Sequence, residues 1–208
     1  EAILRKKKIG STSVNESINA LKELTITLLG KRAKRNALEI ESSEPILKIN
    51  NLGAVEAINL SARMFAHQMI EEAMIAANIC AITFVKSSIG ISINRFHDKP
   101  DTDKLLALFE KFQSLGLKKS DDPIILLQRC IEIAKRNENA ASLQSLILQG
   151  LPRAIYSSKK SGHFGLQLEE YSHFTSPIRR YPDLIIHRLI KSILKKKKVS
   201  FDEELFEE

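Results

Sequence analysis

The segment from Tyr171 to Arg188 contains the densest set of side chains in this chain that can do chemistry. It carries three arginines, two histidines and two tyrosines among serine and threonine hydroxyls and two prolines. Arginines beside hydroxyls at the start of a helix suit a bound phosphate, because guanidinium groups donate in pairs and free backbone N–H groups point outward. Aromatic rings add flat faces on which nucleic-acid bases stack. The segment predicts contact with a phosphate or a nucleic acid; the alternative is that its arginines cap helices or pair with carboxylates.

The prolines define the local geometry of this segment. Pro182 suits the first turn of a helix, and Asp183 after it favours the positive end of the helix dipole. An apolar stripe at helical spacing follows, so a helix is predicted from Pro182 onward. A tight turn over 175–180 then precedes the helix and places Arg179 and Arg180 near its N-terminus.

A pair of glutamates interrupts the most apolar stretch of the chain. Glu71 and Glu72 stand between apolar residues, and Asn78 follows Glu71 by seven positions, so that the two share one face of a helix. Adjacent residues lie about 100° apart on a helix, so both glutamates cannot face solvent equally. One carboxylate is therefore a candidate base, metal ligand or arginine partner in a polar cavity. The alternative is an exposed edge of a packed helix.

Histidines and basic clusters give less specific signals. His163 and His173 stand before the arginines, but they lack the tight spacing and the cysteines that are typical of zinc sites. A hydrogen-bonding or stacking role is therefore favoured for both. Basic clusters such as Lys31–Arg35 are typical of solvated faces or helix ends.

Composition indicates an ordinary globular protein with a moderately basic surface. Its 208 residues are 43% hydrophobic and 27% charged, and 32 basic against 25 acidic residues give a net charge of +7. That charge permits a nucleic-acid partner without requiring one. Two cysteines without a disulfide framework indicate a reducing compartment. A cytoplasmic protein is expected, because no signal peptide or membrane span is visible.

Periodicity predicts a helix-rich α+β fold with few short strands. The predicted helices cover 13–29, 61–85, 103–115, 123–135, 140–149 and 182–197. The predicted strands cover 46–50, 55–59, 89–95 and 163–168. The first two strands form a pair with Gly53 in the turn. The inward side chains expected on the helix over 61–85 are Met64, Ala73, Ala77, Cys80, Ala81 and Phe84.

Several motifs together resemble a known family. Residues 162–166 (Gly-His-Phe-Gly-Leu) and the whole of 171–188 closely resemble the signature of the RNB family, which contains the ribonuclease II and ribonuclease R exoribonucleases. Residues 71–81 are similar to a second helix of that family. Residues 94–100 resemble its Tyr-Arg-Val-His-Glu-x-Pro stretch, with Asn94 in place of the tyrosine.

The resemblance implies a hydrolase that removes nucleotides one at a time from the 3′ end of single-stranded RNA. It implies Mg²⁺ held by clustered aspartates, which activates water and steadies the charge on phosphorus. The family pattern makes Arg179 the arginine that grips the phosphate near the scissile bond, and it makes Glu71 the active-site glutamate. The residues that it implies as RNA contacts are Thr175, Ser176, Arg180, Tyr171 and His173.

The resemblance also implies what surrounds these motifs. Residues 31–197 match the C-terminal half of an RNB catalytic domain, 1–30 a linker and a helix of the same region, and 198–208 an acidic tail. The family's run of metal-binding aspartates has no counterpart in this chain. The ligands of Mg²⁺ are therefore expected elsewhere, and the chain alone is expected neither to bind that metal nor to cleave RNA. Its expected partners are single-stranded RNA, the N-terminal half of the domain and flanking oligonucleotide-binding domains, all within a monomeric parent protein.

Two other classes of function stay open from the sequence. One is a catalytically inactive RNB-like protein that holds RNA or a partner. The other is a helical interaction domain with no role toward RNA. Sequence upstream of Glu1 would separate the first from an active enzyme, since it either contains the aspartates or lacks them.

Overall fold

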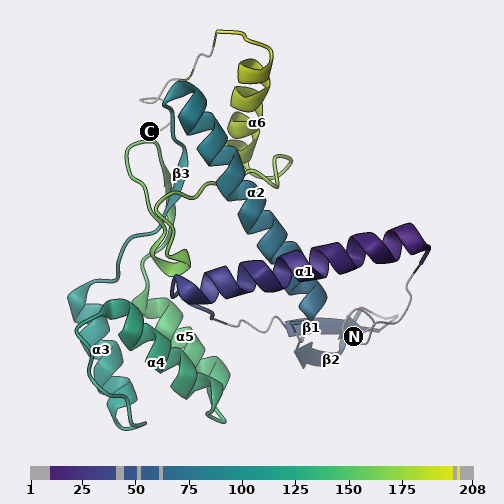
Figure 1. Ribbon diagram of the computed structural model, residues 1–208. Helices are drawn as coiled ribbons and strands as arrows, with labels where there is room; N and C mark the ends of the chain where they lie inside the picture. The colour runs from purple at the N-terminus through teal and green to yellow at the C-terminus, as the bar shows by residue number, and fades with distance from the viewer. Residues whose placement is uncertain (1–9, 41–44, 51–52, 61–62, 199–200, 202–208) are drawn as a thin grey trace. The chain divides into compact units, whose positions relative to one another are not determined.

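The structure is a computed structural model, and it describes residues 10–40, 45–50, 53–60, 63–198 and 201 (Figure 1). The chain divides into two compact units, each made of separate stretches of sequence. The first unit contains residues 1–24, 39–69 and 102–151, and the second contains 25–38, 70–101 and 152–208. Helices dominate and the strands are short, which confirms the predicted α+β class.

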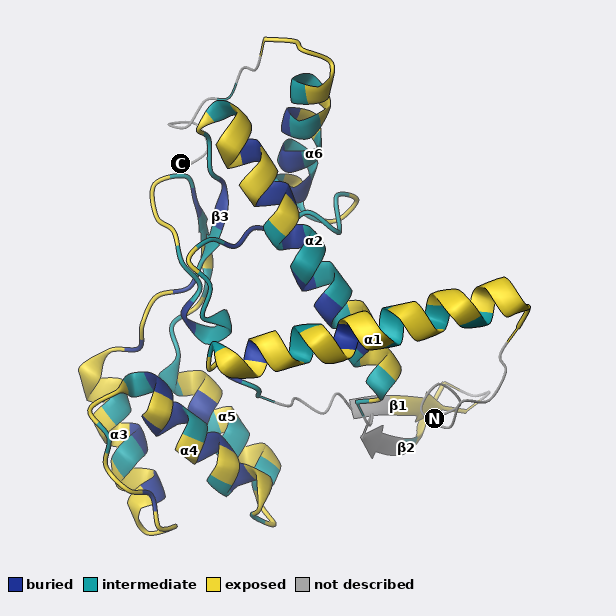
Figure 2. Ribbon diagram, in the orientation of Figure 1, coloured by how far each residue is buried: buried dark blue, intermediate teal, exposed yellow. Residues whose placement is uncertain are grey.

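Three helices form the core of the first unit. They are α3 (Thr102–Gln113), α4 (Pro123–Lys135) and α5 (Ala140–Gly150), and each follows its predicted range closely. Their buried residues face the neighbouring helices, while the outward faces are largely exposed (Figure 2). Asp122 caps α4, because its Oδ1 accepts the N–H of Ile124 at 2.8 Å.

A β-hairpin also belongs to the first unit. β1 (Pro45–Ile49) pairs antiparallel with β2 (Val55–Leu60), which confirms the predicted strand pair. Gly53 lies in the turn with a φ of 79°, a backbone conformation that favours glycine.

Helix α1 (Thr12–Lys34) continues beyond the predicted end at residue 29. Basic side chains in its last turn complement the negative end of the helix dipole. Arg32 in that turn is buried. The cluster Lys31–Arg35 is predicted to be a solvated face or a helix end, and it lies at the end of α1. Arg32 itself is not solvated, because carboxylates of the second unit bind its guanidinium.

Helix α2 (Phe65–Ile89) begins and ends four residues later than the predicted range 61–85. The predicted inward face is wrong in part, since Met64 precedes the helix and Cys80 and Phe84 are exposed. The buried positions of α2 within the second unit are Glu72, Ile75, Asn78, Ala81, Ile82 and Val85. Two of these side chains, Glu72 and Asn78, are polar and bond to other segments of the protein. The buried face of α2 therefore does not coincide with its purely apolar stripe.

By length and hydropathy alone, α2 is able to cross a membrane, and no other helix among the described residues passes that test. Such a helix is weak evidence, because core helices pass the same test. Glu72 and Asn78 on its buried face bond to other segments of the chain, which is the pattern of a core helix.

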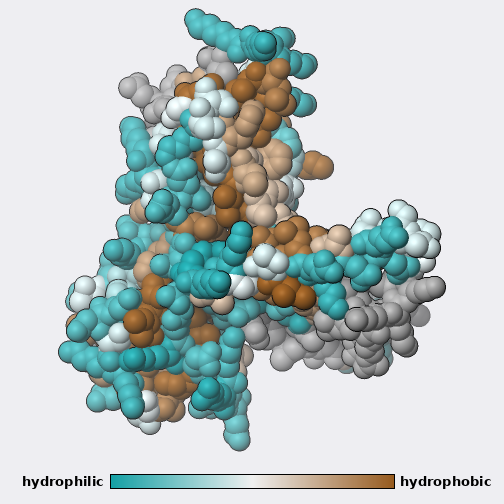
Figure 3. Space-filling view, in the orientation of Figure 1, coloured by the Kyte–Doolittle hydropathy of each residue, from teal (hydrophilic) through white to brown (hydrophobic). Residues whose placement is uncertain are grey.

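Helix α6 (Tyr181–Leu194) packs along α2 in the second unit (Figure 1). The buried apolar cluster consists of Ala81, Ile82, Val85, Ile93, Ile186 and Leu189. Apolar residues gather over these two helices in the space-filling view (Figure 3). The helix predicted over 182–197 is confirmed, with an earlier end.

Two short strands complete the second unit. β3 (Asn94–Phe96) pairs antiparallel with β4 (Ile155–Ser157), a strand that the sequence did not predict. The strand predicted over 89–95 is right only for residues 94 and 95. Helix α2 runs to Ile89, and Gly90 directly after it has a φ of 74°.

The predicted strand over 163–168 is wrong. A 3₁₀ helix, η1 (Phe164–Leu166), stands there instead. The N–H of His163 donates to the carbonyl of Leu168 at 2.8 Å, and Gln167 adopts a left-handed φ of 51°. The segment therefore closes on itself and cannot run as an extended strand.

Candidate phosphate-binding site

A tight turn precedes α6, as the sequence predicts. The N–H groups of Arg179 and Arg180 donate to the carbonyl of Ser176 at 3.3 and 3.1 Å. Helix α6 begins at Tyr181, so Pro182 lies one residue inside the helix rather than at its start. Proline fits there because the first-turn N–H groups of a helix have no helical partner.

The two adjacent arginines have different surroundings. Arg180 is turned inward, with its side chain 19% exposed and its Nη2 donating to Asp183 Oδ1 at 2.7 Å. Arg179 is exposed, and its guanidinium makes no hydrogen bond or ion pair with any described residue. Ile178 beside it is fully exposed. Of the two, Arg179 is therefore the arginine whose paired donors are available to a phosphate.

Side chains from α2 and α6 fix the strand-like segment that leads into the turn. Asn78 Oδ1 accepts the N–H of Phe174 at 2.8 Å, and Asn78 Nδ2 donates to the hydroxyl of Tyr171 at 2.9 Å. His187 Nε2 donates to the carbonyl of Phe174 at 2.9 Å, and its ring stacks on the Phe174 ring at 4.2 Å. Both polar groups of the Phe174 backbone are thus held by helices, which sets the position of the turn that follows.

A buried ion cluster joins α1 to α2. Arg32 Nη1 lies 2.8 Å from Glu71 Oε1 and 2.7 Å from Glu72 Oε1. The side chain of Glu72 is 3% exposed and that of Glu71 is 38% exposed. Burial alone lowers the pKa of Arg32, but hydrogen bonds and the charges of both glutamates outweigh it and raise that pKa. Of the roles that the sequence left open for the glutamates, the structure shows the arginine partner.

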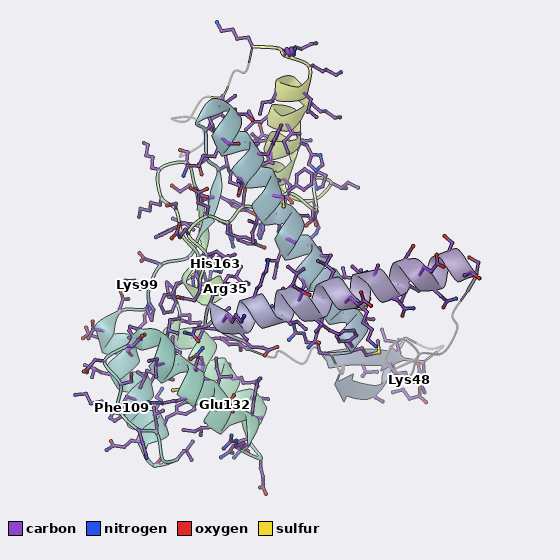
Figure 4. The ribbon with its side chains drawn as sticks, viewed as in Figure 1. Arg35, Lys48, Lys99, Phe109, Glu132 and His163 are labelled. Atoms are coloured by element: carbon purple, nitrogen blue, oxygen red, sulfur yellow. The ribbon has the colours of Figure 1, made fainter. Side chains whose placement is uncertain are left out.

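Arg35 follows one turn later and supports η1. Its Nε donates to the carbonyl of Leu166 at 2.8 Å, and burial lowers its pKa. Figure 4 labels Arg35 close to His163, which precedes η1. This hydrogen bond therefore fixes the end of α1 against the Gly-His-Phe-Gly-Leu motif.

Two neutral histidines support this motif. His97 Nδ1 accepts the N–H of Gly165 at 3.0 Å, so the proton lies on Nε2, which donates to the carbonyl of Pro152 at 3.0 Å. His163 Nδ1 accepts the N–H of Leu166 at 3.2 Å. Burial, together with the nearby His97, lowers the pKa of His163 to about 4. Both imidazoles act as neutral hydrogen-bonding groups.

His173 lies in an aromatic cluster next to the arginine turn. Its Nδ1 lies 2.7 Å from the hydroxyl of Tyr156, and its ring contacts Tyr156 and Tyr171 edge-on at 5.6 Å. Burial and then the charge of Arg180 lower the pKa of His173 to about 4. The guanidinium of Arg95 covers the Tyr156 ring at 4.6 Å. His173 therefore forms the hydrogen-bonding and ring contacts that the sequence favours, as a neutral group.

The remaining predicted RNA contacts differ in accessibility. Tyr171 is buried, and its hydroxyl is bonded to Asn78. The hydroxyl of Thr175 is buried without a hydrogen-bond partner among the described residues, whereas Ser176 is half-buried. RNA contact by these residues, by Arg180 and by His173 stays a prediction.

An open cleft of about 420 Å³ lies elsewhere in the second unit. Lys99 and His163, both labelled in Figure 4, are among the residues that line it. Neither Arg179 nor Glu71 lines this cleft, so it is not part of the arginine turn.

The described residues do not fit a Mg²⁺ site. No group of three His, Cys, Asp or Glu side chains lies close enough among them to hold a metal ion. Glu71 and Glu72 are both bonded to Arg32, whose guanidinium stands where a cation would bind. The contacts of Glu71 and Glu72 with Arg32 are hydrogen bonds and ion pairs.

Arg32 and Asp183 are site residues to which the sequence gave no such role. In the sequence, Arg32 does not differ visibly from the other basic residues of its cluster. It stands seven residues after Thr25, which is also buried. That spacing places both on one face of α1 and is the signal that marks Arg32 as inward. Asp183 is predicted only as a favourable charge at the helix start; its contacts with the turn come from the fold.

Comparison with known proteins shows the family to which this chain belongs. The model of the RNB domain matches residues 1–196, and the chain therefore belongs to the RNB domain family. Ribonuclease R of Escherichia coli (strain K12) is 39% identical over 169 residues, which are 79% of this chain and 21% of that protein. The chain thus spans about a fifth of the length of this curated relative.

Solved structures share the fold. The structure of Mycoplasma genitalium RNase R in complex with ribose methylated single-stranded RNA has a TM-score of 0.79 at 28% identity, over 91% of this chain and 30% of that one. Yeast Ssd1, a pseudonuclease, has a TM-score of 0.68 at 19% identity, over 98% of this chain and 26% of that one. The likeness to Ssd1 concerns the fold alone.

Proposed function

We propose that this chain supplies the phosphate-gripping part of the active site of a 3′-to-5′ exoribonuclease that hydrolyses single-stranded RNA to mononucleotides. The observation that carries the proposal is the exposed Arg179 on a turn whose backbone is held by two helices. Membership of the RNB family and the identity to ribonuclease R support the same reaction class.

The chemical role of Arg179 follows from its geometry. A guanidinium donates two parallel N–H groups to phosphate oxygens, and this pairing strengthens as negative charge grows on the phosphoryl oxygens. Because Ser176 accepts the N–H groups of Arg179 and Arg180, the turn is already formed before RNA binds. Because the backbone of the turn is formed in advance, only the side chain of Arg179 has to reorganise when the charge develops, and this favours the transition state.

Glu71 is proposed as the active-site glutamate. Arg32 Nη1 donates to Oε1 of this carboxylate and so orients it, while 38% of the side chain stays exposed. Glu72 is buried and accepts a hydrogen bond from the same Nη1 of Arg32, which fixes the position of the guanidinium. Glu71 is thus suited to accept a hydrogen bond from a ligand without moving.

The remaining parts of the proposal lie outside the described residues. Mg²⁺ would be held by aspartates of the parent protein and would supply an activated water and charge neutralisation. The parent is proposed to be a monomeric cytoplasmic protein with flanking oligonucleotide-binding domains, and its substrate is single-stranded RNA.

The test uses the intact protein that carries this chain, with RNA labelled at its 5′ end. Shortening from the 3′ end produces a descending ladder and free mononucleotides. Arg179→Ala is expected to lower kcat about 10²- to 10³-fold, as expected for the loss of one transition-state donor, with a smaller loss of RNA affinity. The control is Arg136→Ala, an exposed arginine of the first unit, for which unchanged kinetics are expected. Unchanged turnover in Arg179→Ala would remove the role assigned to that residue.

An inactive RNA-binding protein is the second candidate, because the fold also occurs in a pseudonuclease. The same assay separates the two candidates. The second predicts RNA affinity that falls steeply with salt, as phosphate contacts require, but no shortening of the RNA. Affinity that is weak and insensitive to salt would contradict both and favour a protein-interaction domain.

A further inference from the structure

Asp183 connects both ends of the arginine turn. Its side chain is fully buried in the first turn of α6. A single oxygen, Oδ1, accepts the N–H of Ser176 at 2.8 Å and the Nη2 of Arg180 at 2.7 Å. The other oxygen, Oδ2, is buried and has no hydrogen-bond partner among the described residues. One carboxylate thus joins Ser176 near the start of the turn to Arg180 at its end.

Burial makes this carboxylate costly. Removal of an ion from water is strongly unfavourable, and the positive end of a helix dipole returns only a small part of that cost. Packing does not require an acid here, because α6 already buries Ile186 and Leu189 against α2. The contacts of Asp183 with the turn are the feature that accounts for a buried acid at this position.

The hydrogen bonds around Ser176 form a closed set. Its carbonyl accepts the N–H groups of Arg179 and Arg180, and its own N–H goes to Asp183. Asp183 also holds the side chain of Arg180 inward. The two arginines therefore take different positions. The carboxylate holds the side chain of Arg180 inward, whereas the side chain of Arg179 stays exposed on a fixed backbone.

We propose that Asp183 is a positioning residue that sets Arg179 for its contact with the phosphate. The inference rests on the proposed function of Arg179 and adds the residue through which that arginine is oriented. Asp183 itself does not touch the substrate. Loss of its carboxylate releases Ser176 and Arg180, and Arg179 then samples positions away from the reacting phosphate.

The rest of the segment keeps its place without Asp183. Asn78 and His187 hold both backbone groups of Phe174 two residues before Ser176. Asp183→Asn also keeps the size of the side chain. This variant is therefore expected to fold, with the change confined to the turn.

The kinetic test is a double-mutant cycle in the intact protein. Asp183→Asn keeps an acceptor oxygen but removes the charge that holds the guanidinium of Arg180. It is expected to lower kcat about 100-fold, because small misplacements of a catalytic group cost that much. In an Arg179→Ala background the same change is expected to alter kcat by no more than about twofold, since the residue that it positions is gone. An equal loss in both backgrounds would show a merely structural effect and overturn the proposal. Asp103→Asn is the matched control, an exposed acid in the first turn of α3, and is expected to leave kcat unchanged.

The second test does not depend on activity. Amide hydrogen exchange on the intact protein that carries this chain compares the N–H of Ser176 with that of Phe174. In Asp183→Ala, exchange at Ser176 is expected to accelerate while Phe174 stays protected by Asn78. Unchanged protection at Ser176 would overturn the positioning role even in an active enzyme. Acceleration at Ser176 in a protein without ribonuclease activity would leave the contact standing and reject the proposed function alone.

Discussion

Helices α2 and α4 are core helices of different units, and their buried faces differ. The buried face of α4 is apolar throughout and consists of Ile124, Leu126, Leu127, Cys130, Ile131 and Ala134. The buried face of α2 includes Glu72 and Asn78 among apolar side chains. A buried polar group destabilises a fold unless it is bonded, and both of these groups are bonded to other segments.

The two helices therefore contribute to the protein in different ways. Apolar contacts are non-directional, so α4 stabilises the first unit without fixing any one side chain in a unique position. Hydrogen bonds and ion pairs depend on geometry, so α2 defines where Arg32 and Phe174 lie. Helix α2 thus orients the candidate site, whereas α4 contributes stability. Four measurements test this difference between the two helices.

The largest effect is expected at the buried ion pair of Arg32 and Glu72. Glu72→Met is expected to lower the free energy of unfolding by about 3–5 kcal/mol, because it removes a buried partner of a charged group. The double variant Arg32→Met/Glu72→Met is expected to regain most of that loss, since an apolar pair of similar volume is often neutral. Urea unfolding of the chain measures both. A double variant as unstable as the single one would show that the pair itself stabilises the fold.

A smaller loss is expected at Asn78. Asn78→Ala removes hydrogen bonds to Phe174 and Tyr171 and leaves polar groups unpaired, which is expected to cost about 1–3 kcal/mol in total. Leu127→Ala on α4 is the matched core variant, with an expected cost of about 2–5 kcal/mol. The two differ in amide exchange, since only Asn78→Ala is expected to expose the N–H of Phe174. Loss of protection there in Leu127→Ala would remove the distinction between the helices.

The histidines of the second unit predict a dependence of stability on pH. Burial holds the pKa of His163 and of His173 at about 4, below the ordinary value of about 6.5 in an unfolded chain. Between these values the unfolded chain binds more protons than the folded one, so stability is present above about pH 6.5 and falls as the pH drops toward about 4. Urea unfolding across this window measures the slope. His163→Gln is expected to make the slope shallower, and an unchanged slope in this variant would contradict the prediction.

The smallest effect is expected at the surface of α4. Glu132 and Arg136 form an ion pair at 3.5 Å with side chains 61% and 82% exposed. Glu132→Ala is expected to change the free energy of unfolding by less than about 1 kcal/mol, because water screens such pairs. Glu132→Ala and Glu72→Met thus compare an exposed ion pair with a buried one. A loss at Glu132 as large as that at Glu72 would show that burial does not decide the worth of these ion pairs.

The helices of the first unit were predictable almost residue by residue. Apolar periodicity with Pro123 at a helix start and Gly116 after a helix end marks elements whose polar groups all face outward. In the second unit the same rules misplaced the inward face of α2 and the strand at 163–168. Those rules assume that apolar side chains define the buried face, and they fail where polar side chains have buried partners distant in sequence.

The sequence by itself determined the helix-rich class, the tight turn before α6 and the choice of Arg179 and Glu71 as candidates, because these depend on local periodicity and on motif residues. The tertiary structure alone decided that Arg32 binds both glutamates and that Asp183 retains Arg180 while Arg179 stays exposed. Arg32 and Glu72 are 40 positions apart. Whether a charged side chain meets water or a buried partner depends on which distant segments pack together, and no local pattern contains that information.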